Sequence, residues 1–468
     1  MTAGVVAAVD LGATSGRVVI GRVGGGTLDV QDVHRFPNRP VRTRDGLHWD
    51  VLDLYRNVLE GLRKAFDVEP GIVSIGIDSW AVDYGLLRGD RLLGDPYHYR
   101  DERTARGVAA VDDVVGRAEL YAANGLQFLP FNTLYQLAVD RDEGMLDVAT
   151  SMLLVPDLLA FWLTGERRAE RTNASTTGLL DVTTGDWDDA LVARLGLPRA
   201  LFAPVVEPGE RIGTLTADVA AVVGGRPVPV VAVGSHDTAS AVVAVPLPGP
   251  GSAYICSGTW SLIGTETDAP VLTPESRAAN FTNEGGVDGR TRYLRNVMGM
   301  WLVNECVAAW QAAGHPADLP ALLDEAATID DPVVLDVEDP SLVPAGDMPA
   351  RLVALAPGLA GASPARVLRS IVESLAVAYA RTLDALETLT GDSLDTVNVV
   401  GGASLNRLLC QRLADLSGRV VLAGPVEATA TGNLLVQARA AGLLDGTLED
   451  LRALVARTHP PRRHDPRR

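Results

Sequence analysis

The sequence predicts an α/β protein built from two domains, and three observations support this fold class. At 468 residues, the chain is longer than the size at which a single hydrophobic core keeps growing. A strand–turn–strand pattern at residues 5–20 is repeated at residues 252–264, which suggests an internal duplication. Residues 397–441 alternate strand, helix, strand and helix, with a glycine turn at the carboxyl end of a strand.

The elements between the two hairpins follow from apolar runs and from helical spacing. Residues 72–83 and 228–233 read as buried strands, because short continuous apolar runs bounded by turn residues are typical of such strands. Apolar residues at helical spacing predict helices over residues 153–163 and 366–389, the second of which ends at Gly391.

A proline- and glycine-rich run marks the predicted boundary between the domains. Residues 246–251 read Pro-Leu-Pro-Gly-Pro-Gly, a composition that breaks regular structure. We therefore predict an N-terminal domain over residues 1–245 and a C-terminal domain over residues 246–458. Residues 459–468 form a short, arginine-rich tail that we expect to be disordered.

The composition indicates a globular protein and disfavours nucleic-acid and anionic-membrane partners. Apolar residues make up 47% of the chain, and the net charge of −18 would repel nucleic-acid phosphates. No apolar run approaches membrane-spanning length. Cys256, Cys306 and Cys410 lack the spacing of a disulfide framework or a zinc site. We expect a cytoplasmic monomer or homodimer with neither nucleic-acid nor membrane partners.

The chain contains a single lysine, Lys64, in a segment with the pattern of a solvated helix face. A Walker-type phosphate loop and a protein-kinase fold each need a lysine on the phosphates. Schiff-base catalysis needs a lysine in an apolar pocket. The sequence therefore excludes these three routes, and a bound nucleotide would depend on backbone N–H groups, hydroxyls or a divalent cation.

The turn after the first strand has the composition of a phosphate-binding loop. Residues 12–17 (Gly-Ala-Thr-Ser-Gly-Arg) supply successive backbone N–H groups, two hydroxyls and a guanidinium. The alternative is an ordinary hairpin turn. Asp10 ends the preceding apolar strand, where a carboxylate needs a partner, and beside a phosphate loop that partner is naturally a hydrated Mg²⁺. Asp10 is therefore a candidate metal ligand through water.

A second turn of the same kind appears past the middle of the chain. Residues 257–259 (Ser-Gly-Thr) are small and polar, and the same structural alternative applies to them. With the glycine turn at residues 401–402, the two hairpins suggest a nucleotide whose phosphates are held by one turn from each domain. This arrangement resembles the actin-like (ribonuclease H-like) ATPases, in which two such domains enclose a central cleft.

Asp237 is the candidate general base. It follows an apolar strand within the segment Gly-Ser-His-Asp-Thr, where a carboxylate is able to accept the proton of an attacking hydroxyl. The alternative is a helix N-cap before the residues that follow it. A Ser-His-Asp relay is excluded because adjacent residues do not form such a triad.

Nine motifs, in the family's own order, resemble those of the FGGY carbohydrate kinases. They are Asp10–Arg17, Gly76–Asp83, Tyr99–Thr104, Phe131–Leu137, Ser235–Ala241, Ser257–Leu262, Asn280–Glu284, Asn296–Gly299 and Gly424–Ala428. Each motif alone is a weak signal, whereas nine in order are specific. The resemblance extends to about residue 442.

The resemblance implies a two-domain kinase that transfers the γ-phosphate of ATP, with Mg²⁺, to the 1-hydroxyl of a ketose. L-Rhamnulose is the expected sugar, and Asp237 is the implied base. The residues implied to contact the nucleotide are Ala13, Thr14, Ser15, Gly16, Arg17, Thr259, Asn304 and Gly402. The residues implied to hold the sugar are Ala81, His236, Asp237, Thr238 and Asn296.

Two of these positions depart from the family's usual pattern. Ala81 stands where the sugar-contacting turn normally has glycine, and Asn304 stands where a nucleotide contact is normally glutamine. A methyl group beside the sugar would make the pocket smaller than a glycine does. Ala81 therefore bears on which ketose is preferred and not on the reaction. The tryptophan before Ala81 is either core or pocket, and its neighbours Asp78 and Asp83 serve either sugar hydroxyls or internal hydrogen bonds.

Two other functions remain open at this stage. The first is an FGGY kinase acting on a related ketose or polyol, such as L-fuculose or D-xylulose. The second is a non-catalytic protein, either a nucleotide-dependent interaction protein or a sugar sensor. Because the base position is occupied by Asp237, the sequence favours an enzyme.

Overall fold

The computed structural model describes residues 3–247, 251–315 and 317–467. Its contacts group the chain into two compact units. The first comprises Met1–Pro246, Glu266–Tyr293 and Ala428–Thr458, and the second comprises Leu247–Thr265, Leu294–Glu427 and His459–Arg468. These units are discontinuous, unlike the predicted linear division, because two later segments pack with the N-terminal residues. Of the predicted boundary run, residues 248–250 lie outside the described residues.

The first unit contains most of the short strands and helices. Its strands are β1 (Gly4–Leu11), β2 (Ser15–Gly24), β3 (Thr27–Pro37), β4 (Pro40–Arg42), β5 (Leu47–Trp49), β6 (Ile72–Ser79), β7 (Tyr84–Arg88), β8 (Arg91–Leu92), β9 (Ser151–Leu154), β10 (Ala169–Glu170), β11 (Val205–Val206), β12 (Arg211–Thr214), β13 (Pro229–Val231) and β16 (Thr282–Gly285). Its helices are α1 (Val51–Val68), α2 (Thr104–Asp112), α3 (Arg117–Asn124), α4 (Thr133–Asp142), α5 (Val155–Thr164), α6 (Arg171–Ala174), α7 (Asp189–Arg194), α8 (Ala217–Val222), α9 (Asp237–Val243), α10 (Pro274–Ala278), α16 (Ala428–Ala440) and α17 (Leu448–Thr458).

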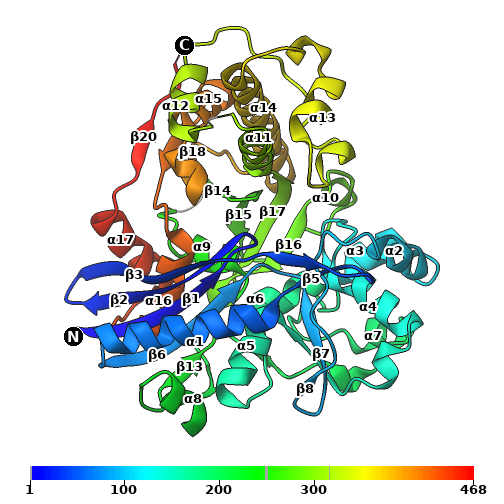
Figure 1. Ribbon diagram of the computed structural model, residues 1–468, viewed down its shortest axis with the longest axis vertical. Coiled ribbons are helices and arrows are strands. Elements are labelled where there is room, and N and C mark those ends of the chain that lie inside the picture. The colour runs from blue at the N-terminus through cyan, green and yellow to red at the C-terminus, as the bar shows by residue number, and fades with distance from the viewer. Residues whose placement is uncertain (1–2, 248–250, 316, 468) are drawn as a thin grey trace. The chain divides into compact units, whose positions relative to one another are not determined.

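The main sheet of the first unit has the strand order β12-β13-β6-β1-β2-β3 (Figure 1). Strand β1 pairs antiparallel with β2 and parallel with β6, which confirms the predicted N-terminal hairpin. Helix α1 packs at Gly61 against Val18, and helix α16 packs at Leu434 against Gly21. Because Val18 and Gly21 lie on opposite faces of β2, the two helices cover both faces of the sheet. The apolar run that forms β1 reflects this double burial.

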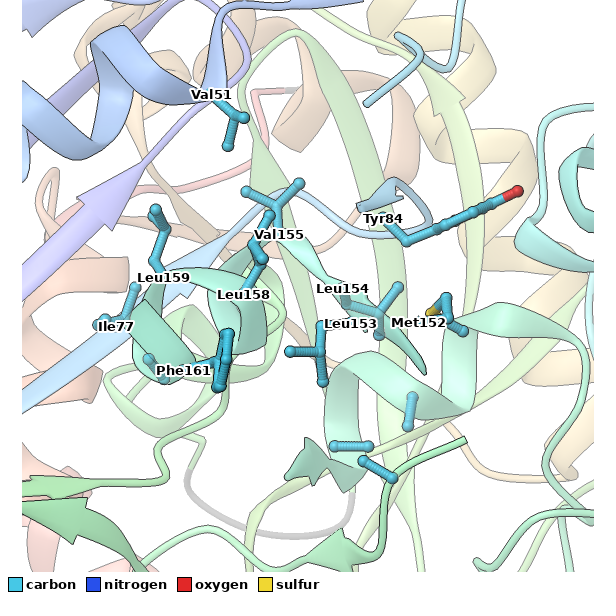
Figure 2. Packing of buried hydrophobic residues seen from close by; sticks show 14 of the residues in the cluster. Val51, Ile77, Tyr84, Met152, Leu153, Leu154, Val155, Leu158, Leu159 and Phe161 are labelled. Atoms are coloured by element: carbon cyan, nitrogen blue, oxygen red, sulfur yellow. The ribbon is translucent and has the colours of Figure 1, made fainter. Parts of the chain in front are cut away.

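The hydrophobic core of the first unit extends from the sheet into α5 and β9. Figure 2 shows side chains of both elements packed beside Ile77 of β6 and near Val51 of α1. The predicted helix over residues 153–163 begins only at Val155, because residues 151–154 pair with β7 as β9. Pro156 lies in the first turn of α5, where its missing N–H costs nothing. No helix in the described parts of the chain is long and apolar enough to cross a membrane.

The second unit repeats the strand pattern of the first. Its elements are β14 (Ser252–Ser257), most of β15 (Trp260–Thr267) and β17 (Thr291–Met298), β18 (Thr396–Val400), β19 (Val420–Ala423), β20 (Arg462–His464), α11 (Trp301–Ala312), α12 (Leu319–Ala326), α13 (Met348–Leu355), α14 (Pro364–Thr390) and α15 (Arg407–Ser417). The strand order is β17-β15-β14-β18-β19-β20. Strand β14 is antiparallel to β15 and parallel to β18, as β1 is to β2 and β6. The predicted duplication and the α/β fold class are confirmed.

Helix α14 shows how local signals set the ends of an element. Ser363 caps its N-terminus by accepting a hydrogen bond from the Arg366 N–H, and Pro364 occupies the first turn. Gly391 ends the helix at φ 77°, the left-handed conformation that glycine adopts without strain. The predicted helix therefore matches α14 within two residues at its start.

The expectation of a disordered C-terminal tail is wrong. Residues 462–464 form β20, which pairs antiparallel with β19 at the edge of the second sheet. Backbone pairing does not require apolar side chains, so the arginine-rich composition hid this strand. His464 is buried against the sheet although its neighbours are exposed.

Helices α9 and α16 of the first unit cross at a position that admits only glycine. A Cβ atom added to Gly432 of α16 would lie 1.8 Å from the Ser240 carbonyl oxygen of α9. The carbonyl oxygen belongs to the backbone, and the position of a Cβ atom does not depend on the side-chain rotamer. A rotamer change would therefore not relieve the clash. Because α9 begins at Asp237, this close approach constrains the helix that carries the candidate base.

We predict that Gly432→Ala lowers the free energy of unfolding by about 1–3 kcal/mol, the usual cost of overpacking. Alanine is intrinsically the better helix former by about 1 kcal/mol, so a loss must come from the clash. Urea unfolding followed by circular dichroism measures the change. Gly94→Ala, whose added methyl meets no atom within 4 Å, is the control and should shift stability by less than about 0.5 kcal/mol. A Gly432→Ala protein as stable as wild type would contradict the crossing.

Candidate active site

Asp237 is the first residue of α9 and lies partly open to solvent, with 32% of its side chain exposed. The Thr238 hydroxyl donates to its Oδ1 at 3.0 Å, and His236 Nε2 lies 3.5 Å from the same oxygen. Burial raises the pKa of Asp237 above its ordinary value, and the charge of Asp10 adds to this, whereas the hydrogen bond from Thr238 lowers it. A solvent-accessible carboxylate with a raised pKa is a suitable proton acceptor.

The loop before Asp237 is held by the buried carboxylate of Glu170. Both the N–H and the hydroxyl of Ser235 donate to Glu170 Oε2, at 3.0 and 2.7 Å. The same carboxylate accepts bonds from the Thr172 N–H and hydroxyl, at 2.8 and 2.6 Å. The Ser235 carbonyl in turn accepts a bond from the Ser79 N–H at 2.9 Å. These contacts attach the loop to the end of β6 and so position His236 and Asp237.

Three charged residues lie side by side across the sheet next to this loop. Asp10 of β1 is in register with Arg17 of β2 and with Asp78 of β6. Arg17 donates to Asp10 Oδ2 through Nε at 2.9 Å and through a terminal nitrogen at 2.6 Å. Burial, with Asp10 nearby, raises the pKa of Asp78 well above its ordinary value, although Asn433 donates to it at 2.5 Å. The partner that Asp10 needs is therefore Arg17 in this structure.

The first predicted phosphate turn is well defined. Its base is closed by the Gly12 N–H, which donates to the Ser15 carbonyl at 2.8 Å. Asn38 holds it from the side, because its side chain donates to the Gly12 carbonyl at 2.9 Å and its N–H donates to the Thr14 carbonyl at 3.0 Å. Thr14 and Ser15 are exposed, whereas Gly16 is buried. The loop presents its tip to solvent.

Ala81 lies in a strained turn at the end of β6. The Asp83 N–H donates to the Ala81 carbonyl at 2.9 Å across Val82, whose φ is 69°. This is a γ-turn in the rare conformation that is strained for a β-branched residue. The hydroxyl of Thr133 donates to the Val82 carbonyl at 2.7 Å and helps hold the turn in place. Such strain persists only where surrounding contacts enforce it.

Asp83 supplies those contacts through internal hydrogen bonds. Its carboxylate accepts bonds from the indoles of Trp49 and Trp80, from the Tyr99 N–H and from the Gln136 amide. Burial raises the pKa of Asp83 to about 7, against the opposing effect of these four donors. The two options for Asp83 are therefore resolved in favour of internal bonding, and Trp80 is a core residue, 6% exposed.

The predicted residues of the second unit lie on four of its elements. The turn that carries Thr259 is closed by the Gly258 N–H, which donates to the Trp260 carbonyl at 2.9 Å. Gly299 permits its close packing, since an added Cβ would lie 2.7 Å from the Trp260 carbonyl carbon. The other predicted positions are Asn296 on β17, Asn304 on the exposed face of α11, and Gly402 after β18.

Sequence reasoning missed several residues that build the site. Glu170 and Asn38 are distant in the chain from the motifs they hold, and no local pattern marks them. Asn433 was hidden in a helical segment. No group of three or more His, Cys, Asp or Glu side chains suited to a metal occurs in the parts of the chain that are described. The single lysine, Lys64, pairs with Glu60 on α1 at 3.0 Å, as a solvated helix residue does.

Comparison with known proteins agrees with this architecture. The N-terminal domain model of the FGGY family of carbohydrate kinases matches residues 5–244, and the C-terminal domain model matches residues 253–441. A rhamnulokinase from Bacteroides thetaiotaomicron is 39% identical over 466 residues, covering 98% of this chain and 95% of that protein. A rhamnulokinase from Pectobacterium atrosepticum is 40% identical over 475 residues, covering 99% and 93%.

Solved structures of sugar kinases share the fold. Gluconate kinase from Lactobacillus acidophilus has a TM-score of 0.80 at 16% identity, covering 100% of this chain and 94% of that one. Ligand-bound xylulose kinase from the same organism has a TM-score of 0.81 at 17% identity, covering 99% and 94%. With both domain models matched and two relatives near 40% identity over almost their whole length, the chain belongs to the FGGY family of carbohydrate kinases.

Proposed function

We propose that this protein transfers the γ-phosphoryl group of ATP to the 1-hydroxyl of L-rhamnulose, giving L-rhamnulose 1-phosphate in L-rhamnose catabolism. The observation that carries the proposal is the 39–40% identity to two rhamnulokinases over 98–99% of the chain. The accessible carboxylate of Asp237, with its raised pKa, supports a reaction that needs a proton acceptor.

In the proposed reaction, Asp237 accepts the proton of the 1-hydroxyl as its oxygen bonds to the γ-phosphorus. The bond from the γ-phosphorus to the bridging oxygen breaks, and ADP leaves with that electron pair. Catalysis then depends mainly on positioning and on fixed charge. The Glu170 contacts at Ser235 and the α9–α16 crossing supply that positioning for Asp237.

The nucleotide is proposed to contact Ala13, Thr14, Ser15, Gly16, Arg17, Thr259, Asn304 and Gly402. Because the Arg17 guanidinium is bound to Asp10, we infer that it acts partly by holding this carboxylate. Magnesium keeps several waters and binds chiefly to nucleotide phosphates, so one carboxylate reached through water suffices. Asp10 fits this role, and the metal would neutralise charge on the phosphates.

The sugar is proposed to contact Ala81, His236, Thr238 and Asn296. Of these, His236 and Thr238 flank the base, and Ala81 lies in the strained turn at the end of β6. An L-fuculose or D-xylulose kinase differs from this proposal only in the ketose. We further propose that the protein acts in the cytoplasm as a monomer or homodimer.

We expect Asp237→Asn to lower kcat by about 10²–10⁴-fold, because an amide cannot accept the proton. The affinity for ATP should change less than about twofold, since Asp237 is not proposed to touch the nucleotide. An ADP-release assay measures the first quantity and calorimetric titration with ATP the second. Asp90→Asn is the control, because this side chain is 86% exposed on the surface. A near-normal rate in Asp237→Asn would refute the assignment.

We predict that the acid limb of the pH profile of kcat/KM for the sugar lies above pH 3.8, the ordinary pKa of the Asp side chain. The base works only when deprotonated, so activity falls as the pH falls through its pKa in the folded enzyme. Burial and Asp10 raise that pKa and therefore move the limb to higher pH. Steady-state rates between pH 4 and 9 at saturating Mg-ATP give the profile. A limb at or below 3.8 would argue against Asp237 as the titrating group.

The preferred ketose follows from rates of ADP release with L-rhamnulose, L-fuculose, D-xylulose, L-ribulose and glycerol. We expect L-rhamnulose to give the highest kcat/KM. Ala81→Gly should alter the KM for sugars by no more than about 200-fold and leave the KM for ATP unchanged, since one methyl group in a pocket is worth about 1–3 kcal/mol at most. Preference for another ketose would keep the kinase and change the substrate. An absence of sugar-dependent ADP release would support the sensor alternative.

A further inference from the structure

The imidazole of His236 lies between the candidate base and a buried ion pair. Its Nε2 is 3.5 Å from Asp237 Oδ1. On the opposite side, its Nδ1 is 3.0 Å from a terminal nitrogen of Arg292 and 3.3 Å from Glu284 Oε2. Only 8% of the histidine side chain is exposed, so water has little access to the ring.

The ion pair belongs to the hairpin formed by β16 and the first residues of β17. Arg292 is fully buried, donates through Nε to the Gly285 carbonyl at 2.9 Å, and lies 3.1 Å from Glu284 Oε2. Burial raises the pKa of Glu284, but the charge of Arg292 beside it lowers this pKa, which lies below its ordinary value. Glu284 therefore stays ionised and balances the charge of Arg292.

A guanidinium only donates hydrogen bonds, so the nitrogen that faces it at 3.0 Å has to accept one. A neutral imidazole has one accepting nitrogen, and the other then carries the proton. A proton on Nδ1 would serve Glu284 at 3.3 Å but would point a donor at the donor of Arg292. The shorter contact with Arg292 favours the unprotonated Nδ1.

We propose that Arg292, balanced by Glu284, holds His236 as the neutral tautomer with its proton on Nε2. Arg292 and Glu284 are thus positioning residues that act through His236. The Nε2–H then faces Asp237 Oδ1 at 3.5 Å and the space beside it, where it donates to a sugar oxygen in the complex. The catalytic consequence rests on the proposed sugar-kinase function, whereas the tautomer does not.

Nuclear magnetic resonance of ¹⁵N-histidine-labelled enzyme reads the tautomer directly. The chain has seven histidines, so the loss of one signal set in His236→Gln assigns the residue. At pH 8, without sugar or nucleotide, we expect a protonated Nε2 and an unprotonated, downfield-shifted Nδ1. A protonated Nδ1, or an imidazolium with both nitrogens protonated, would overturn the proposal. Because no substrate is present, this result is independent of which ketose the enzyme uses.

The role of the ion pair is tested by removing both charges together. Arg292→Met alone would leave a buried Glu284 without its partner, so the variant is the double Arg292→Met/Glu284→Gln. We expect the preference for the Nε2–H tautomer to be lost and kcat/KM for the sugar to fall roughly five- to tenfold, with the KM for ATP unchanged. Arg292→Lys keeps a charged donor and should restore part of both properties.

A matched control separates this effect from general loosening. Arg452 and Glu266 form another buried pair, 2.8 Å apart, and Arg452 donates to the Val242 carbonyl of α9. Arg452→Met/Glu266→Gln removes the same chemistry next to the same helix without touching His236, so the tautomer should persist. If the Arg292/Glu284 double variant kept both the Nε2–H signal and a wild-type kcat/KM, Arg292 would not position His236.

Discussion

The buried carboxylate of Glu170 is the constraint on which the catalytic arrangement depends. Burial raises the pKa of Glu170 above its ordinary value, although the donors from Thr172 and Ser235 lower it. A buried acceptor of this kind is costly unless every lone pair is used, so the loop has little freedom to move away. Because Ser235 also pairs with Ser79, the loop is fixed to the end of β6. Glu170, which takes no part in the proposed chemistry, therefore positions Asp237 through the loop that it holds.

The same region keeps carboxylates close together while limiting their repulsion. Asp10 is neutralised by Arg17, and burial raises the pKa of Asp78 well above the ordinary value, which favours its neutral form. Asn433 satisfies one oxygen of Asp78 with an uncharged donor. The negative charge that remains accessible is that of Asp237, at the N-terminus of α9. In a chain with net charge −18 and one lysine, such pairing limits the repulsion that an anionic nucleotide would meet at the proposed site.

Local sequence signals predicted the two hairpins, the duplication and helix α14, because each depends on neighbours in the chain. Pro364 and Gly391 set the ends of α14, and residues 5–9 read as buried because helices cover both faces of β1. The same signals could not reveal Glu170, which acts on a loop 65 positions away, or Arg292, which meets His236 across 56 positions. They also failed at the tail, where backbone pairing alone forms β20. The motifs predicted the candidate site, whereas the residues that hold these motifs in place are brought there by tertiary contacts.

The two duplicated hairpins differ in the residues that lie next to their turns. In the first unit, the row next to the turn places Arg17, Asp10 and Asp78 side by side on β2, β1 and β6. The corresponding row of the second unit places Leu262, Cys256 and Val400 on β15, β14 and β18. The turn beyond this apolar row is supported instead by a chain of hydroxyls from Ser257, Ser261 and Tyr379, at 2.7 and 2.5 Å. Of these two corresponding rows, only the one in the first unit carries carboxylates and a guanidinium, whereas the turn of the second unit is supported by neutral hydroxyls. A second charged row would add repulsion or a competing ion pair beside its own turn, so the apolar row allows neutral groups alone to hold that turn.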